Sequence, residues 1–314
     1  MEQATASAPA SIGNVGVGFD ILGQAFDAAR DVVTAAREDA PGVRLGDVSG
    51  LVSSLPVEVH RNTALAAAAA LLEHANARFG VRISIEKGVP VSAGMGGSAA
   101  SAVAAVGAVN ALLGSRYSID QLLPFALEGE RVASDPPHWD NVMASLHGGL
   151  VLAASFEQAL VQQLPVPRGL VTILLHPDVK TETKAARALL AKDVPMTTVV
   201  EHSRRLAAFV AGCATGDLAL LKTGLEDVLV EPQRLHLLPL LAEVKKAAIE
   251  AGAIGCSFSG SGPSVFTWVE EAHAAKVEAA MSWTFADAGL AARAYRGPVS
   301  SAGLRVERVA ETVS

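Results

Sequence analysis

The sequence contains few cysteines and few aromatic residues for its length. Its 314 residues include two cysteines, Cys213 and Cys256, and aromatic residues make up 4% of the chain. Two thiols in a chain of this length form neither a disulfide framework nor a cysteine-rich metal cluster. We therefore expect both thiols to be buried and reduced, as they are in a cytoplasmic protein.

Basic residues are also scarce. Lysine and arginine number 25 against 32 aspartates and glutamates, which gives a formal net charge of -7. Proteins that bind nucleic acid usually carry a basic stripe, because neutralising phosphates drives their affinity. No run of lysine or arginine resembles such a stripe. The composition therefore predicts a small-molecule partner and no nucleic acid.

An uninterrupted apolar run is missing as well. The chain begins Met1-Glu2-Gln3, and no basic region precedes an apolar run there, so we expect no secretory signal. Residues 88–115 carry no charge, but Pro90 and several glycines and serines break the first half of this stretch. A membrane span needs about 20 predominantly apolar residues. We therefore expect no membrane segment, and interpret the stretch as a glycine loop followed by a buried helix.

Small apolar residues are abundant. Half of the chain is hydrophobic, much of it alanine and valine, and 18% is charged. Small apolar side chains suit close packing of helices on sheets, and the length suggests about two domains. We expect a mixed α+β chain with domains at 1–160 and 161–314, divided near the polar, proline-containing residues 158–169.

The hydrophobic pattern predicts alternating strands and helices. Residues 8–22 read as a loop-rich opening because of their glycines. Alternation over residues 81–86 predicts a strand, and residues 98–113 predict a helix that Gly114 closes. A further helix should begin near Ser118 and stop before Pro136. The remaining expected elements are helices at 62–77, 198–214 and 235–251 and strands at 150–152, 170–175 and within 262–269.

A glycine-rich stretch, PVSAGMGGSAAS at residues 90–101, lies between the expected strand and helix. Glycines let backbone amides approach a ligand. The N-terminus of the following helix directs free N–H groups and a positive dipole end to the same place. These features predict a bound anion, and a polyphosphate suits the site best.

Two other interpretations of the glycine stretch remain open. Gly94, Gly96 and Ala99 fit the dinucleotide fingerprint G-x-G-x-x-G/A, with Asp120 about 20 residues further on as a ribose contact. The stretch is also compatible with a purely structural turn. A Walker loop is excluded, because it requires Gly-Lys-Ser or Gly-Lys-Thr.

Residues 90–101 resemble the second motif of the GHMP kinase superfamily, P-x-x-x-G-L-G-S-S-A-A-S, with Gly97-Ser98 where the family often has two serines. APASIGNVGVGFDILG at residues 8–23 is similar to the first motif, in the form that homoserine kinases use. Gly252-Ala253, followed by SGSGPSVF at residues 259–266, is similar to the third. Three motifs in the family order, over nearly the whole chain, make a specific signal.

The stretch between the second and third motifs resembles the homoserine kinase subfamily. Glu130 precedes HWDNV at residues 138–142, which is similar to the H-x-D-N-V pattern of those enzymes. Arg187 and Arg234 match two arginines that they use on the amino-acid substrate. Guanidinium groups bind a carboxylate in a bidentate fork, as a zwitterionic substrate requires.

The resemblance implies an α+β fold of two domains, the first like a ribosomal-protein domain and the second ferredoxin-like. It implies an enzyme that uses ATP and Mg²⁺ to phosphorylate the hydroxyl of L-homoserine, and a homodimer. The metal candidates are Ser98 and Glu130, and the catalytic candidates are these two and Asp140. The ATP-binding candidates are Asn62, Lys87, Pro90, Val91, Ser92, Ala93, Gly94, Met95, Gly96, Gly97, Ser98, Ala99, Ala100 and Ser101. The substrate-binding candidates are Asn14, Asp20, His138, Asp140, Asn141, Arg187, Arg234 and Gly260.

Two alternative functions share the implied fold. One is a GHMP kinase for another small alcohol, such as a mevalonate-type substrate, against which Arg187, Arg234 and the H-x-D-N-V stretch argue. The other is a non-catalytic sensor that binds ATP and ligand, against which Glu130 and the three motifs argue. A nicotinamide-dependent oxidoreductase is the remaining and more distant alternative.

Overall fold

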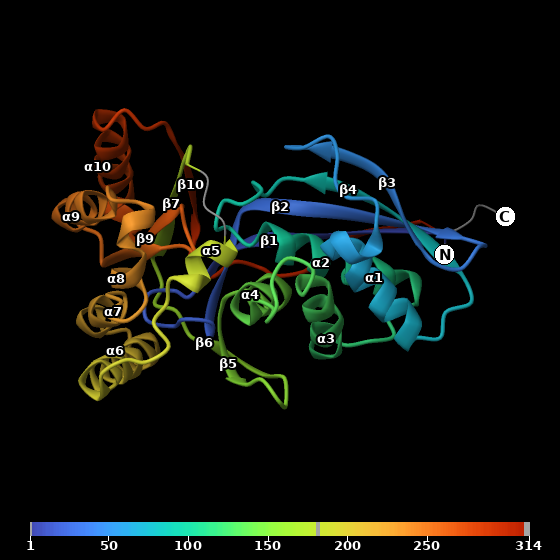
Figure 1. Cartoon of the computed structure of the whole chain (residues 1–314), viewed down its shortest axis with the longest axis horizontal. Coiled ribbons are helices and arrows are strands. Elements are labelled where there is room, and N and C mark those ends of the chain that lie inside the picture. The colour runs from blue at the N-terminus through green and yellow to red at the C-terminus, as the bar shows by residue number, and fades with distance from the viewer. Residues whose placement is uncertain (1, 180–182, 311–314) are drawn as a thin grey trace.

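The chain folds into two β-sheets, each with helices packed on it, in the computed structural model (Figure 1). The structure describes residues 2–179 and 183–310. The strands are β1 (Gln3–Gly13), β2 (Leu22–Glu38), β3 (Val43–Gly50), β4 (Gly80–Lys87), β5 (Leu150–Ser155), β6 (Leu160–Leu164), β7 (Leu170–Pro177), β8 (Gly255–Phe258), β9 (Val265–Glu270), β10 (Ala292–Pro298) and β11 (Arg305–Ala310). The α-helices are α1 (Thr63–His74), α2 (Gly97–Leu112), α3 (Ile119–Glu130), α4 (Trp139–His147), α5 (Thr183–Ala188), α6 (Met196–Thr215), α7 (Leu218–Gly224), α8 (Glu231–Arg234), α9 (Leu241–Ala251) and α10 (Ala274–Asp287).

The first sheet has the strand order β11-β1-β2-β4-β3, and β5 and β6 extend it from β2. β3 pairs with β4 in parallel, and the other pairings are antiparallel. Helices α1 to α4 pack together on one side of this sheet (Figure 1). The strand β11 returns from the far end of the chain, where Gln3 pairs with Ala310.

The helix α2 runs through the middle of the first core. Every residue from Ala99 to Leu112 is buried, as expected of a helix that is apolar on all sides. Its alanines and glycines allow neighbouring backbones to come close. A Cβ atom added to Gly107 would lie 2.4 Å from the Leu304 side chain. Small side chains therefore let α2 sit tightly between the sheet and its neighbours, with its N-terminus directed at the glycine stretch.

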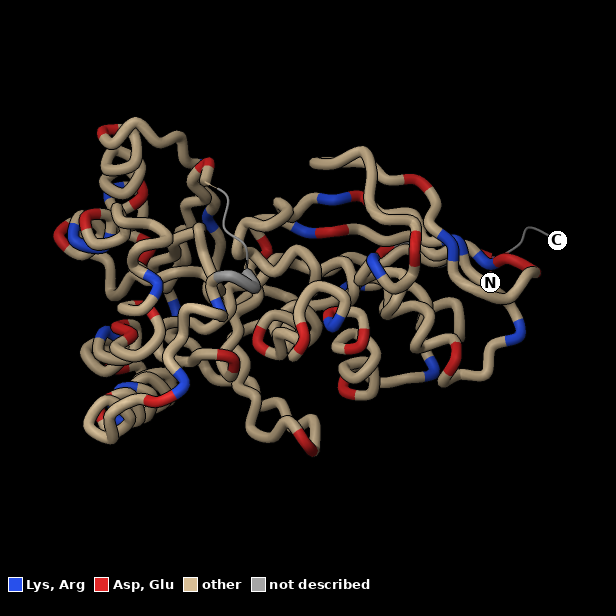
Figure 2. Tube along the Cα trace, in the orientation of Figure 1, with Lys and Arg blue, Asp and Glu red and all other residues tan. Residues whose placement is uncertain are grey.

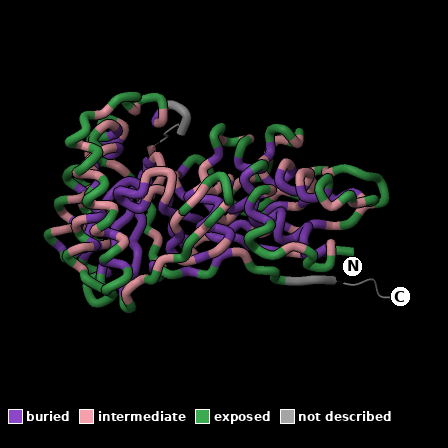
Figure 3. The backbone as a smooth tube through the Cα atoms, turned by 90° about the horizontal axis from the view of Figure 1, so that it is seen from below, coloured by how far each residue is buried: buried purple, intermediate pink, exposed green. Residues whose placement is uncertain are grey.

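The second sheet is antiparallel, with the order β10-β7-β9-β8. Helices α9 and α10 cover one of its faces (Figure 1). A separate apolar cluster joins the two sheets, and within it Gln24 of β2 donates to Thr172 Oγ1 at 2.8 Å. Trp268 Nε1 donates to Gln24 Oε1 at 2.8 Å. Figure 3 shows buried chain continuing from one sheet to the other.

Two sequence-based expectations about elements were wrong, and one strand lies in a stretch for which no element was predicted. Residues 8–13 belong to β1, because pairing with β2 and β11 outweighs the weak strand preference of alanine and serine. The polar residues 158–169 contain β6, an added strand of the first sheet. The helix expected at 235–251 begins only at Leu241, after a 3₁₀ turn and Pro239.

The proposed boundary near residue 160 stays a prediction. The chain crosses between the sheets after β6 and again before β11, so the first sheet contains strands from both ends of the sequence. Within the described ranges, no helix is both long enough and apolar enough to cross a membrane. Figure 2 shows acidic and basic residues interspersed over both halves.

Candidate active site

A cavity of about 470 Å³ opens where the three glycine-rich stretches meet. All eight substrate-binding candidates line it. Glu130 lines it too, and so do most of the glycine stretch and the predicted residues Asn62 and Lys87. Pro90, Ala99 and Ala100 lie outside its lining. The structure thus brings together residues from the first sheet, helices α2 to α5 and α8, and the turn after β8.

Hydrogen bonds hold the three glycine-rich stretches together. Ser11 N–H donates to Met95 O at 3.0 Å, which joins the first stretch to the second. Ser259 Oγ donates to Gly94 O at 2.6 Å, which joins the third to the second. Asn14 Nδ2 donates to Gly260 O at 2.8 Å, which closes the circle between the first and the third. The motifs therefore form one structural unit around the cavity.

Gly94 and Gly96 are required by the geometry of this unit. Both have positive φ, at 70° and 65°, a region that side-chain-bearing residues rarely adopt. A Cβ atom on Gly94 would lie 2.5 Å from Ser259 O, and one on Gly96 would lie 2.0 Å from Ser11 Oγ. Gly96 is the N-cap of α2, so its conformation sets where the first turn of that helix points.

Glu130 lies at the C-terminal end of α3, with 1% of its surface exposed. Its Oε1 accepts from Ser98 Oγ at 3.0 Å and lies 3.1 Å from His138 Nδ1. Burial opposes the imidazolium of His138. The hydrogen bond to Glu130 and the nearby charge of Asp140 outweigh that effect, so the pKa of His138 is raised. The two elements α2 and α3 therefore present a hydroxyl and a carboxylate side by side.

Glu130 and Ser98 fit a hard cation. Oε2 of Glu130 is buried, and among the described residues it has no hydrogen-bond partner. A buried carboxylate oxygen without a partner is costly unless a ligand satisfies it. Mg²⁺ prefers oxygen and is usually held by one or two protein carboxylates together with substrate phosphates. No group of three or more His, Cys, Asp and Glu side chains suited to a metal occurs in the described part of the chain.

Asp140 is a buried carboxylate in the lining of the cavity, and it accepts hydrogen bonds from two other lining residues. It is 1% exposed, and burial raises its pKa to about 6 against the opposing charge of His138. Its Oδ2 accepts from Asn14 N–H at 2.9 Å, and its Oδ1 accepts from Asn141 N–H at 2.8 Å. The first turn of α4 brings these side chains together, because His138 is the N-cap of that helix. The H-x-D-N-V stretch is therefore the start of a helix.

Arg187 and Arg234 approach the same part of the cavity from α5 and α8. Arg187 forms two hydrogen bonds to the carboxylate of Asp20, at 2.8 and 2.9 Å. Arg234 is 4% exposed and donates to the carbonyls of Ala186 at 3.2 Å and Gly260 at 3.4 Å. Both guanidinium groups lie over the ring of Phe19, at 5.6 and 5.4 Å. Burial, and then the charge of Arg187, lower the pKa of Arg234.

Lys87 lines the cavity, and its side chain also has partners within the protein. Its Nζ is bonded to the buried carboxylate of Asp31 and donates to Gly97 O at 2.9 Å, and its predicted part in ATP binding stays a prediction. Ser101 Oγ donates to the same carboxylate at 2.6 Å. Asp31 also accepts from Gly88 N–H at 3.1 Å. Lys87 and Ser101 thus connect the glycine stretch to Asp31 of β2.

Asn62 also has an internal role. It is the N-cap of α1, where its Oδ1 accepts from Ala64 N–H at 3.1 Å. Its Nδ2 donates to Pro56 O at 2.9 Å. It still lines the cavity, so it shapes the wall with its polar groups already engaged. Sequence reasoning missed Phe19 and Asp31. Phe19 lies inside the first motif, whereas nothing near Asp31 signals its role.

Two family models match the chain: the GHMP kinases N terminal domain at residues 62–149 and the GHMP kinases C terminal domain at residues 208–287. A homoserine kinase from Xanthomonas campestris pv. campestris (strain B100) is 45% identical over 307 residues, covering 98% of this chain and 94% of that protein. The chain belongs to the homoserine kinase family of GHMP kinases. One from Xylella fastidiosa (strain M12) is 42% identical, with 97% and 94% covered.

A solved member of the homoserine kinase family confirms the fold. The crystal structure of homoserine kinase from Cytophaga hutchinsonii ATCC 33406 superposes with a TM-score of 0.93. It is 38% identical, and 98% of each chain is covered. The predicted α+β GHMP kinase fold is therefore confirmed, and so is the resemblance on which it was based.

Proposed function

We propose that the chain transfers the γ-phosphoryl group of ATP to the hydroxyl of L-homoserine. One observation carries this proposal: the cavity combines an anion-binding glycine loop with a buried guanidinium that forms no ion pair within the described part of the chain. Among the described residues, Arg234 forms no ion pair, although it is 4% exposed and faces the cavity. A buried cation needs a counter-charge. An acceptor substrate with a carboxylate supplies it.

Each part of the cavity has a role in this proposal. The first turn of α2, with Gly96, Gly97 and Ser98, faces the polyphosphate and offers free N–H groups. Glu130 and Ser98 would hold Mg²⁺, which supplies charge neutralisation at the phosphates when bound. Arg234 receives the substrate carboxylate.

The ammonium group of homoserine would be bound by acidic residues that line the same cavity as Arg234. Asp20 keeps acceptor capacity while it is bonded to Arg187, because a carboxylate offers about four lone-pair sites. Asp140 adds a second carboxylate to the cavity, and Asn14 connects the two residues by accepting from Asp20 N–H at 3.1 Å and donating to Asp140. The zwitterion is thus matched at both of its ends.

Alignment is the main contribution of these residues to phosphoryl transfer. The reaction passes through a loose transition state, so placement and charge stabilisation dominate. Both carboxylate oxygens of Asp140 already accept N–H groups, and His138 faces Glu130. We therefore assign no general base. Asp140 acts as a substrate contact and an organiser of the first turn of α4.

A substrate panel tests the proposal. ATP consumption is measured with Mg²⁺ and with homoserine, serine, threonine or mevalonate as acceptor. We expect homoserine to give the highest kcat/KM. Preference for mevalonate would indicate a kinase for another alcohol, and tight ATP binding without turnover of any acceptor would indicate a sensor. The cytoplasmic location and the homodimer remain predictions.

A further inference from the structure

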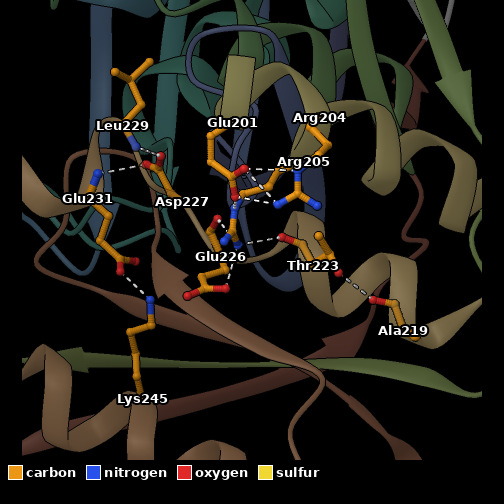
Figure 4. Close-up of polar contacts among 10 residues, drawn as sticks. All are labelled: Glu201, Arg204, Arg205, Ala219, Thr223, Glu226, Asp227, Leu229, Glu231 and Lys245. Carbon is orange, nitrogen blue, oxygen red and sulfur yellow. Dashed lines mark hydrogen bonds and ion pairs between the residues drawn. The ribbon is translucent and has the colours of Figure 1, made fainter. Parts of the chain in front are cut away.

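Arg234 lies on a helix of a single turn, so something outside that helix must fix its position. The helix α8 runs from Glu231 to Arg234, and an isolated turn of this length has no stability of its own. Glu231 starts the turn and is itself 7% exposed. Figure 4 shows its carboxylate directed at Lys245, and Glu231 is not part of the cavity lining.

The carboxylate of Glu231 is held from two directions. Ser257 Oγ in β8 donates to Oε2 at 2.6 Å. Lys245 Nζ in α9 forms an ion pair and hydrogen bond with Oε1. Burial raises the pKa of Glu231, and the charge of Lys245 opposes that effect. The side chain of Glu231 therefore ties the start of α8 both to a strand and to a long helix of the second sheet.

The end of α8 contacts the turn that follows β8. Arg234 donates to Gly260 O at 3.4 Å. Residues 231 and 234 thus contact residues 257 and 260, with equal spacing on both sides. The contact between Glu231 and Ser257 holds the turn in place. The contact between Arg234 and Gly260 helps to direct the guanidinium to the cavity. Asp227 strengthens the arrangement by accepting from Glu231 N–H at 2.8 Å.

We propose that Glu231, clamped by Lys245 and Ser257, is a positioning residue that aims the Arg234 guanidinium at the carboxylate of the acceptor substrate. This inference rests on the proposed function. It adds a residue outside the cavity lining, whose effect reaches the substrate through Arg234. A displacement of about 1 Å at a binding group, caused by a change away from the chemistry, can reduce rates about a hundredfold.

The experiment compares Glu231→Ala with Arg234→Ala and with the double variant, in steady-state assays with homoserine and ATP. We expect Glu231→Ala to raise the KM for homoserine about tenfold or more, with the KM for ATP within about twofold of the wild-type value. Glu231→Gln keeps an acceptor for Ser257 but loses the charge, so its effect should be smaller. In the double variant the KM for homoserine should match that of Arg234→Ala alone, because both changes remove the same contact.

The neighbouring ion pair supplies a matched control. Glu226 lies five residues earlier and pairs with Arg205 Nη1 at 2.6 Å, with 64% of its side chain exposed. Figure 4 shows that this pair belongs to the contacts with Glu201 on α6 and is separate from the Glu231–Lys245 pair. Glu226→Ala should leave both KM values unchanged.

The outcomes separate this inference from the proposed function. Absence of homoserine turnover in the wild-type chain would overturn both. A raised KM for homoserine in Arg234→Ala, with an unchanged KM in Glu231→Ala, would overturn the positioning role alone. Multiplying effects in the double variant, or equal losses for ATP and homoserine, would also overturn it. Should Glu231→Ala fail to fold, Ser257→Ala and Lys245→Met each remove one tie and leave Glu231 in place; normal homoserine KM values in both would contradict the proposal.

Discussion

At the scale of single residues, Glu130 is the position in the cavity where we expect a substitution to lower activity most. Its Oε2 is buried and has no hydrogen-bond partner within the described chain. This oxygen is therefore available to bind a cation. We expect Glu130→Gln to lower kcat by about a hundredfold or more, because an amide oxygen carries no charge for the metal. The measurement is Mg²⁺-dependent ATP turnover with homoserine, together with a thermal unfolding curve.

A glutamate two residues earlier gives the control for Glu130. Glu128 is on the same helix, with 59% of its side chain exposed, and pairs with Arg131 at 3.2 Å. Glu128→Gln should change kcat by less than about twofold, since surface ion pairs contribute about 0–1 kcal/mol. Wild-type turnover in Glu130→Gln would remove Glu130 from the reaction.

Motif residues could be predicted from the sequence, whereas their supporting partners could not. Glu130, His138, Arg187 and Arg234 all line the cavity, because short motifs record which residue types face a ligand. Asp31 escaped prediction because its partners come from β4 and α2, dozens of residues away. The same separation in sequence explains why the ion pair between Lys87 and Asp31 was not predicted.

At the scale of secondary structure elements, the start of α2 depends on Gly96. We expect Gly96→Ala to raise the KM for ATP about tenfold or more, because a Cβ atom would lie 2.0 Å from Ser11 Oγ and φ is positive. Gly114→Ala is the matched control: its φ is 78° and nothing lies within 4 Å of the added atom. It should cost about 1–2 kcal/mol of stability and leave the KM for ATP unchanged. Similar ATP kinetics in both variants would contradict the assigned role of Gly96.

The Asp31–Lys87 pair sets the junction of β2, β4 and α2. The Asp31 side chain is 0% exposed and that of Lys87 is 4% exposed. Asp31→Asn should lower the free energy of unfolding by about 3–5 kcal/mol, because it leaves a buried ammonium without its counter-charge. Adding Lys87→Met should recover much of the loss. Denaturant unfolding measures both variants, and an equal or larger loss in the double variant would show that the pair is not coupled.

Strongly periodic or capped elements could be predicted, and elements fixed by long-range pairing could not. The helix around residues 98–113 and the strand around 81–86 have clear local signals, and they match α2 and β4 within a residue or so. β1 has no such signal, because its alanines and serines become a strand only between β2 and β11.

At the scale of the whole molecule, the reactivity of the two buried thiols measures how often the protein unfolds. Burial raises the pKa of Cys213 and of Cys256 to about 12, which reduces the thiolate about a thousandfold relative to a pKa near 9. We expect neither cysteine to react with a disulfide reagent at pH 8 in the native protein. Both should react once denaturant has unfolded the chain. Rapid labelling of either thiol under native conditions would show that local opening exposes it.

The return of β11 to the first sheet has a consequence for synthesis. β1 is made first, yet one of its two neighbours is β11, made last, with Gln3 opposite Ala310. During translation this side of β1 remains an open edge while the entire second sheet is being made, and an open edge invites pairing with other chains. The first sheet therefore cannot be completed before β11 has been synthesised, and until then one side of β1 depends on other parts of the chain, or on chaperones, for protection.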